Sequence, residues 1–278
     1  MEYEKIDWNE IWKKLMIAQQ KLDKMGDKNE YWNKKENAEL FWKRSQEHSK
    51  KTCDILMELP FTSNSRILDI GSGPGRLAIP LAKKVSHLTA VEPAKGMIEI
   101  LKENIKKESI DNIKCINKRW EEVDVENDLD ATYDIVIASF SLGMPDIKEA
   151  IKKMEQASSK YIYLYWFAGV TPWEKHSIAL WPSLYGTNYI AGPKCDVLYN
   201  VLYNMGIYPD MHVFSMEYTN NFVSIDEAID FYKKRFIIQT NEQERILYKY
   251  LKNILVQKNN QLVEYGHSKR VRISWAKD

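Results

Sequence analysis

Apolar residues recur at helical spacing at the start of the chain, and further along they gather into short runs between helical stretches. Over residues 1–60 the spacing of positions such as Trp8 and Trp12 predicts amphipathic helices. Between residues 66 and 166, short apolar runs bounded by polar or turn residues predict strands. These runs cover residues 66–70, 88–92, 113–117, 133–139 and 161–166. Regular alternation of strand and helix indicates a parallel sheet with helices on both faces.

The alternation breaks after residue 166. Residues 168–210 are rich in Pro, Gly, Trp and Tyr, with one short helix expected over 196–205, and they are interpreted as an inserted lid. A strand near 212–218 and two helices follow, and residues 261–275 alternate as a closing antiparallel strand. The prediction is a doubly wound α/β fold. Its sheet is mostly parallel and seven-stranded with the last strand antiparallel, and N-terminal helices and a lid are added to it.

Charge and cysteine usage narrow the class of partner. The chain carries 40 Lys and Arg against 39 Asp and Glu, which argues against binding nucleic acid over a broad surface. The basic patches at 233–235 and 269–270 are interpreted as solvated faces. The cysteines form no CxxC pair and the histidines show no ligand spacing, so no metal site is expected. Without an apolar signal or spanning run, we expect a cytoplasmic protein with no membrane partner.

One segment carries a pattern suited to holding a charged ligand. The sequence RILDIGSGPGRL at 66–77 places Gly71, Gly73 and Gly75 between an apolar strand and an apolar helix. Glycines at such a turn let backbone approach a ligand closely, because no Cβ fills the space that the ligand needs. The free N–H groups at the start of the helix favour an anion, and Asp69 at the strand end favours an ammonium group.

An acidic residue at the end of the second strand extends the pattern. Glu92 follows Gly71 by about 20 residues, the spacing at which a carboxylate takes the two hydroxyls of a ribose. The alternative is the glycine turn of a nicotinamide- or flavin-binding domain. That pattern, GxGxxG, requires glycine at position 76, where this chain has Arg76. The spacing therefore favours another nucleoside ligand over a dinucleotide.

ILDIGSGPG and VEPAKGMIEILKEN together resemble the glycine motif and second-strand motif of class I S-adenosylmethionine-dependent methyltransferases. The resemblance covers residues 66–166 and implies S-adenosylmethionine as the cofactor, with S-adenosylhomocysteine as its product. It implies that Asp69 and the three glycines line the methionyl side, that Glu92 binds ribose and that Met97 packs near the adenosine. The expected parts are an N-terminal helical cap (1–60), a cofactor-binding core (61–167), a lid (168–210) and a completion of the sheet (211–278).

Three further residues follow from the family layout, and two of them have an open alternative. Trp120 lies where the family places residues near adenine, although the usual acidic and small residues are missing, and a core position is equally consistent. Ser139 ends the fourth strand, whose tip faces the reaction centre. Phe140, directly after it, is expected against the sulfonium through a cation–π contact, with packing under the loop as the alternative.

The acceptor half of the reaction is less defined. The fourth strand lacks the Asn/Asp-Pro-Pro-Tyr/Phe motif of many amide and amino-group methyltransferases and lacks a Pro-Cys nucleophile. If the acceptor needs deprotonation, Glu174 and His176 are the first candidates. The expected substrate is a small molecule accepting methyl on O, N or S. The alternatives are a protein or RNA acceptor, or a protein that binds the cofactor without turnover. The aromatic residues expected around the acceptor are Tyr31, Trp32, Trp166, Trp173 and Tyr185.

Overall fold

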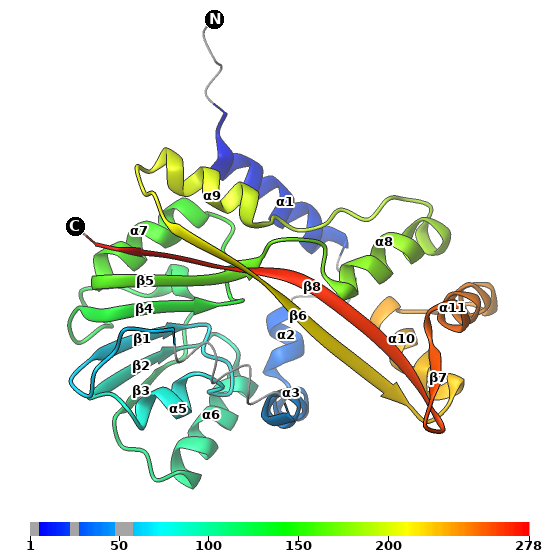
Figure 1. Ribbon diagram of the computed structural model, residues 1–278, viewed down its shortest axis with the longest axis horizontal. Helices are drawn as coiled ribbons and strands as arrows, with labels where there is room; N and C mark the ends of the chain where they lie inside the picture. The colour runs from blue at the N-terminus through cyan, green and yellow to red at the C-terminus, as the bar shows by residue number, and fades with distance from the viewer. Residues whose placement is uncertain (1–5, 23–27, 48–57, 278) are drawn as a thin grey trace, which may run out of the picture.

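The computed structural model describes residues 6–22, 28–47 and 58–277. Within them, one sheet has the strand order β3-β2-β1-β4-β5-β8-β6, and β7 pairs with β8 (Figure 1). β1 to β5 are parallel, whereas β8 is antiparallel to both β5 and β6. The predicted fold is confirmed, with the short β7 as an addition. The strands are β1 (Arg66–Ile70), β2 (His87–Val91), β3 (Ile113–Ile116), β4 (Tyr133–Ser139), β5 (Ser158–Phe167), β6 (Asp210–Phe222), β7 (Val256–Lys258) and β8 (Gln261–Ala276).

Helices cover both faces of this sheet. None of those in the described ranges is long and apolar enough to cross a membrane. They are α1 (Trp8–Leu22), α2 (Lys28–Asn33), α3 (Lys35–Glu47), α5 (Ala78–Ala82), α6 (Lys95–Lys107), α7 (Ile147–Ala157), α8 (Pro172–Tyr185), α9 (Cys195–Asn204), α10 (Ile225–Phe236), α11 (Asn241–Ile254) and the 3₁₀ turn η1 (Trp120–Glu122).

The two faces of β1 feed two separate cores, because successive side chains of a strand point to opposite sides. Leu68 and Ile70 pack on the side of α1, α7 and α9. Ile67 packs on the side of α5 and α6, and Asp69 shares that side through the same alternation. The acidic residue of the glycine segment is therefore buried beneath α5 rather than set on an open surface.

The N-terminal helices divide between the two faces. Trp12 of α1 is fully buried, packs at 5.8 Å between ring centroids on Trp166, and donates its Nε1 hydrogen to the Met144 carbonyl at 2.9 Å. α2 and α3 lie instead against α6 (Figure 1). Residues 1–5, 23–27 and 48–57 of the predicted helical cap lie outside the described residues.

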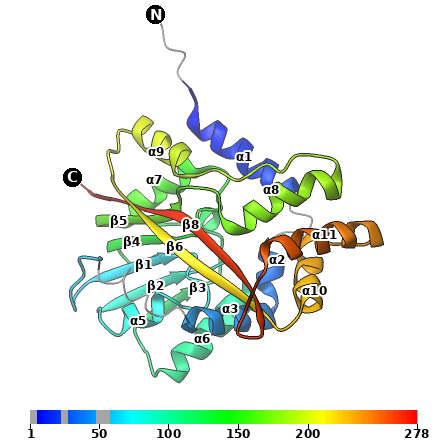
Figure 2. The ribbon, with the colours of Figure 1, turned by 45° about the vertical axis from the view of Figure 1, so that its right-hand side comes forward.

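β6 and β8 form a long ribbon that leaves the sheet. Only 270–276 of β8 pair with β5, and the preceding residues pair with β6 or β7. Because β8 is antiparallel to β5, the ribbon projects past the carboxyl ends of the parallel strands (Figure 2). α8, α10 and α11 pack around it in a third apolar cluster. Helix α8 lies in the segment where only the shorter α9 was predicted.

Candidate functional site

The glycine turn after β1 shows what each glycine does. Gly71, Gly73 and Gly75 have φ of 71°, 56° and 97°, the left-handed region in which a Cβ is strained. A Cβ on Gly71 would also collide with Ser141, and one on Gly75 would press on the Leu101 and Ile79 side chains. A Cβ on Gly73 would meet no atom of the described residues within 4 Å. Packing therefore requires two of the glycines, and the third borders free space.

Glu92 joins this turn to the end of β2. Its Oε2 accepts a hydrogen bond from the Gly73 N–H and its Oε1 accepts one from the Ala94 N–H, both at 2.9 Å. The side chain is only 7% exposed, and burial raises the pKa of Glu92 against the opposing effect of these two backbone bonds. Each carboxylate oxygen keeps a further lone pair. Glu92 is thus held rigidly beside the open side of Gly73.

Asp69 is buried beside the same turn without an ionic partner at bonding distance. Its side chain is 1% exposed, and Oδ2 has no hydrogen-bond partner among the described residues. Burial raises the pKa of Asp69 to about 7, opposed by the charge of Arg76 and reinforced by that of Glu92. A buried carboxyl group that lacks a hydrogen-bond partner is stabilised by a ligand that brings a positive charge or a hydrogen-bond donor.

We expect Asp69→Asn to stabilise the ligand-free protein at pH 8 and not at pH 4. The native pKa of about 7 exceeds the ordinary 3.8, so the native state holds the proton more tightly and wild-type stability falls as pH rises between these values. The gain at pH 8 is at most about 4 kcal/mol, since one pKa unit corresponds to about 1.4 kcal/mol. Urea unfolding at both pH values measures it. The exposed Asp111→Asn variant is the control, and equal gains at pH 4 and pH 8 would contradict the assignment.

The tip of β4 faces the glycine turn. Ser141 Oγ donates to the Ile70 carbonyl at 2.5 Å, which joins this tip to the end of β1. Phe140 has φ of 57°, a strained conformation for a residue with a side chain, and its N–H donates to the Tyr165 carbonyl at 2.9 Å. Ser139 Oγ is buried and lacks a partner among the described residues, as does Ser72 Oγ of the turn. Unpartnered buried oxygens therefore gather on both sides of the turn.

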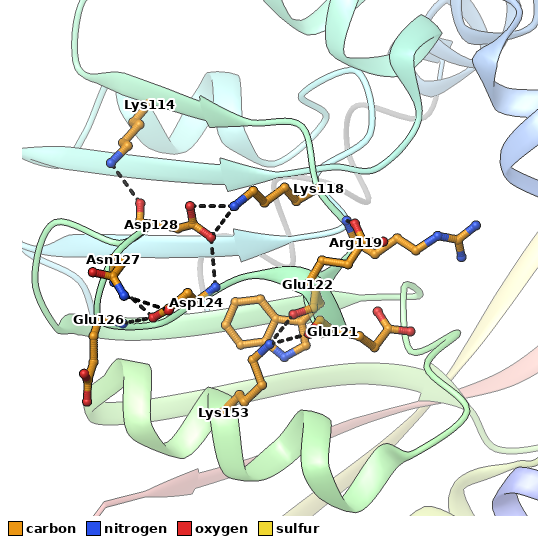
Figure 3. A network of polar contacts seen from close by, with 11 residues as sticks. Lys114, Lys118, Arg119, Glu121, Glu122, Asp124, Glu126, Asn127, Asp128 and Lys153 are labelled. Atoms are coloured by element: carbon orange, nitrogen blue, oxygen red, sulfur yellow. Dashed lines mark hydrogen bonds and ion pairs between the residues drawn. The ribbon is translucent and has the colours of Figure 1, made fainter.

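The two remaining candidates for the adenosine side are packed differently. Met97 lies in a cluster with Ala38 and Trp32, so α2 and α3 adjoin the start of α6. Trp120 is 2% exposed and donates its Nε1 hydrogen to the Ala150 carbonyl at 3.0 Å. Lys153 Nζ donates to the carbonyls of residues 120 and 121, in the polar surroundings shown in Figure 3. The Trp120 ring therefore packs in the core against α7, and its place beside adenine stays a prediction.

Residues 67–160 match the model of a methyltransferase domain family. These residues therefore form a methyltransferase domain, and the chain has the fold of the class I S-adenosylmethionine-dependent methyltransferases. The cofactor implied by this match is S-adenosylmethionine. Its fold is shared by the YcgJ protein of Bacillus subtilis, at 13% identity with a TM-score of 0.57, over 84% of this chain and 100% of that one. A structure from Bacillus halodurans described as a methyltransferase has the same identity and TM-score, over 82% and 99% of the two chains.

Curated relatives match parts of this chain. An uncharacterized Haemophilus influenzae protein is 27% identical over 59% of this chain and 58% of its own length. A probable ribosomal RNA small subunit methyltransferase A of Methanosphaera stadtmanae is 36% identical over 30% of this chain and 31% of its own. Ribosomal RNA small subunit methyltransferase G of Aliivibrio fischeri is 30% identical over 40% and 53%. The chain thus spans less than two thirds of the length of these relatives.

The residues at the glycine turn fit the cofactor. S-adenosylmethionine has an ammonium group, a carboxylate and a ribose diol. The unpartnered Asp69 Oδ2 is chemically suited to the first, and the Glu92 carboxylate to the last. The free space next to Gly73 adjoins the Glu92 carboxylate, which accepts the Gly73 N–H. A Cβ on Gly73 would obstruct a ligand in this space.

The fold brings some of the predicted acceptor residues together and separates others. Trp173 packs edge-on against Phe167, whose ring lies 5.3 Å from that of Phe140, so these rings adjoin the β4 tip. Tyr31 packs on Trp32, next to Met97. Two others lie in packing clusters: Trp166 donates its Nε1 hydrogen to the Pro193 carbonyl and Tyr185 donates to the Phe236 carbonyl. Their roles toward an acceptor stay predictions.

Glu174 is tied into the start of α8. Its Oε2 accepts from the Thr171 N–H and hydroxyl, each at 2.9 Å, while Thr171 Oγ1 accepts the Glu174 N–H in a capping box. Lys194 Nζ donates to its Oε1 at 2.6 Å. With 2% exposure and this full set of partners, the side chain has an evident structural role, and its role as a base stays a prediction.

His176 lies in a buried polar cluster under the ribbon. Its Nε2 is 2.6 Å from Glu264 Oε1 and its Nδ1 is 2.8 Å from the Tyr250 hydroxyl. The same Glu264 oxygen accepts from Tyr218, and the other oxygen accepts from Tyr232 at 2.5 Å. Both ring nitrogens are therefore engaged within the protein, and a catalytic role for His176 stays a prediction.

Arg270 was missed by sequence reasoning. The interpretation of 269–270 as a solvated patch is wrong for this residue: its guanidinium carbon lies 4.4 Å from the Phe140 ring centroid, 5.2 Å from that of Phe167 and 5.8 Å from that of Trp173. Lys269 is exposed, as expected of a solvated patch. The alternation of apolar residues in β8 places Lys269 and Arg270 on opposite faces, but it does not tell which of the two is covered.

Proposed function

We propose that this chain transfers the methyl group of S-adenosylmethionine to an O, N or S atom of a small molecule. The observation that carries the proposal is that helices of the core and of the ribbon meet beside the carboxyl edge of the sheet. α3 adjoins α6 of the core, and its Arg44 lies 6.0 Å from the Phe231 ring of α10, so it bridges the core and the ribbon helices (Figure 2). An edge bounded in this way suits an acceptor that is surrounded on binding.

The proposed cofactor contacts follow the side chains described above. Asp69 would hold the ammonium group, and Glu92 would take the ribose hydroxyls while keeping its bond from the Gly73 N–H. Gly71 and Gly75 would shape the turn, and Gly73 would leave room for the methionyl chain. These assignments are supported by burial and by the unpartnered oxygens of the turn.

Little further chemistry is required of the protein. When bound, the cofactor supplies a methyl group on a positively charged sulfur that is already a good leaving group. The protein then contributes by orienting the acceptor atom in line with the methyl group and by excluding water. Phe140 at the β4 tip would face this centre, with Arg270 already stacked against its ring. No residue is required to act as a base unless the acceptor is protonated.

The relatives that are named ribosomal RNA methyltransferases support a second candidate, an RNA acceptor. Two features of this chain favour a small-molecule acceptor instead. Lys233, in the basic segment considered for RNA, pairs with Glu244 at 2.8 Å instead of standing free. The formal net charge of +1 is also small for a protein that binds the phosphate backbone of RNA.

Methyl-labelled S-adenosylmethionine distinguishes the candidates. We expect incubation with a cell extract to label the small-molecule fraction, analysed by mass spectrometry, and not the RNA or protein fraction. Glu92→Ala should abolish labelling, because losing two hydrogen bonds to a charged group weakens cofactor binding by about 100-fold or more. The exposed Glu99→Ala variant in α6 should label normally. Label confined to RNA or protein would overturn the proposal.

A further inference from the structure

The guanidinium of Arg270 is set among aromatic rings. Among the described residues no ion pair includes it, and its one hydrogen bond there runs from Nε to Ser268 Oγ at 3.2 Å. The Phe140, Phe167 and Trp173 rings surround the cation. A guanidinium has five N–H donors in a planar fork, so the donors on its two terminal nitrogens remain for a ligand.

A second arginine adds positive charge to the same place. Arg76, directly after Gly75, is half-buried, and burial is the main cause that lowers its pKa, with the charge of Asp69 opposing it. Burial and, to a lesser extent, the positive charge of Arg76 lower the pKa of Arg270 to about 10, so the two cations repel each other. Two partly buried like charges are unfavourable unless an anion joins them. Asp69 is the carboxyl group near Arg76, but its own pKa of about 7 leaves it partly protonated at neutral pH.

Arg270 lies at the edge of the sheet where the reaction is proposed to take place. Arg270 pairs in register with Phe167 at the last residue of β5, and Phe140 follows the last residue of β4. The cation therefore lies at the carboxyl edge of the parallel strands, where ligands bind in sheets of this kind. The adjoining rings offer flat apolar surface next to the cation.

From this arrangement we infer that the methyl acceptor is an anion whose carboxylate or phosphate group binds Arg270, with Arg76 adding to the attraction. The aromatic rings would contact an apolar part of the same molecule. The inference rests on the proposed methyltransferase function and narrows its substrate class. An oxyanion matches the guanidinium fork through two parallel N–H bonds and also neutralises the repulsion between the two arginines.

The cofactor carboxylate is the competing occupant, and binding measurements separate the two. S-adenosylhomocysteine is titrated calorimetrically into wild type, Arg270→Gln and Arg270→Lys. If Arg270 serves the acceptor, all three bind this product with affinities within about twofold, which also shows that the variants fold. A loss of tenfold or more in both variants, with their melting temperatures unchanged, would assign Arg270 to the cofactor and overturn the inference.

The anion site itself is tested on the protein saturated with S-adenosylhomocysteine. Benzoate and inorganic phosphate are titrated separately at low ionic strength, where screening is weak. At least one should bind wild type, with about tenfold or greater loss in Arg270→Gln and normal binding in Lys269→Gln, which removes the same charge from the neighbouring exposed residue. Binding of neither anion, or equal loss in both variants, would overturn the inference.

The labelled product gives an independent check. In the extract experiment, a product retained on an anion exchanger at neutral pH supports the inference, and a neutral or cationic product contradicts it. Absence of any labelled product, with anion binding intact, would count against the proposed function and leave the anion site standing.

Discussion

Replacing Gly73 by valine is expected to abolish S-adenosylmethionine binding while leaving the fold intact. The position opens onto free space, because a Cβ there would meet no atom of the described residues within 4 Å, so the valine side chain is expected to fill the space assigned to the methionyl chain. Calorimetry should show affinity lowered by about 100-fold or more, since a ligand excluded by two methyl groups loses several contacts as well as its backbone approach.

Gly206→Val is the matched control for Gly73→Val. Gly206 also has a positive φ, 81°, and free space where its Cβ would lie, but it follows α9 on the opposite face of the sheet. Both variants should lose a similar few kcal/mol of stability from backbone strain. Normal cofactor binding by Gly73→Val, or equal loss in Gly206→Val, would show that the open side of the turn is not the cofactor site.

Replacing Glu264 by glutamine should lower the free energy of unfolding by about 3 kcal/mol, the cost of leaving a buried polar network partly unpaired. The carboxylate is 2% exposed and accepts from His176 and Tyr218 on one oxygen and from Tyr232 and Asn220 on the other. A glutamine of the same size turns an N–H₂ group toward donors on one side. Urea unfolding at pH 7 measures the loss.

The pH dependence tests the same cluster. Burial would raise the pKa of Glu264, but the hydrogen bonds from His176, Tyr218, Tyr232 and Asn220 outweigh it and hold the pKa at about 2. Because the native pKa lies below the ordinary 4.5, the stabilisation is complete above pH 4.5 and is lost as pH falls toward 2. The gap between wild type and Glu264→Gln should therefore narrow in acid. The exposed Glu242→Gln variant in α11 should change stability by less than about 0.5 kcal/mol at any pH.

This cluster also depends on a glycine far from the cofactor. Tyr218 on β6 pairs in register with Gly266 on β8, and its ring lies where a Cβ of Gly266 would be. The missing side chain lets the ring lie over the backbone so that the hydroxyl reaches Glu264. His176 is therefore buried by the ribbon and its helices, although its place in the chain suggested a residue of an open lid.

The sequence by itself determined the cofactor half of this protein. The alternation of strands and helices predicted the sheet, and the glycine turn with Glu92 predicted the family, because those residues act through local backbone geometry and a short βαβ unit. Helix α8 was missed because its prolines and aromatics resemble a loop in composition. Its Thr171 and Glu174 capping box was the local signal that was available.

Only the tertiary structure decided what surrounds the acceptor edge. Arg270 and Glu264 acquire their surroundings from the register of β8 against β5 and β6, which joins residues about 50 to 100 positions apart in the chain. A shift of one residue would turn every side chain of that strand to the other face, so no local pattern reveals which of Lys269 and Arg270 is buried. Strand pairing over that distance is settled by packing on both faces of the finished sheet, and that packing placed Arg270 beside the proposed site of methyl transfer.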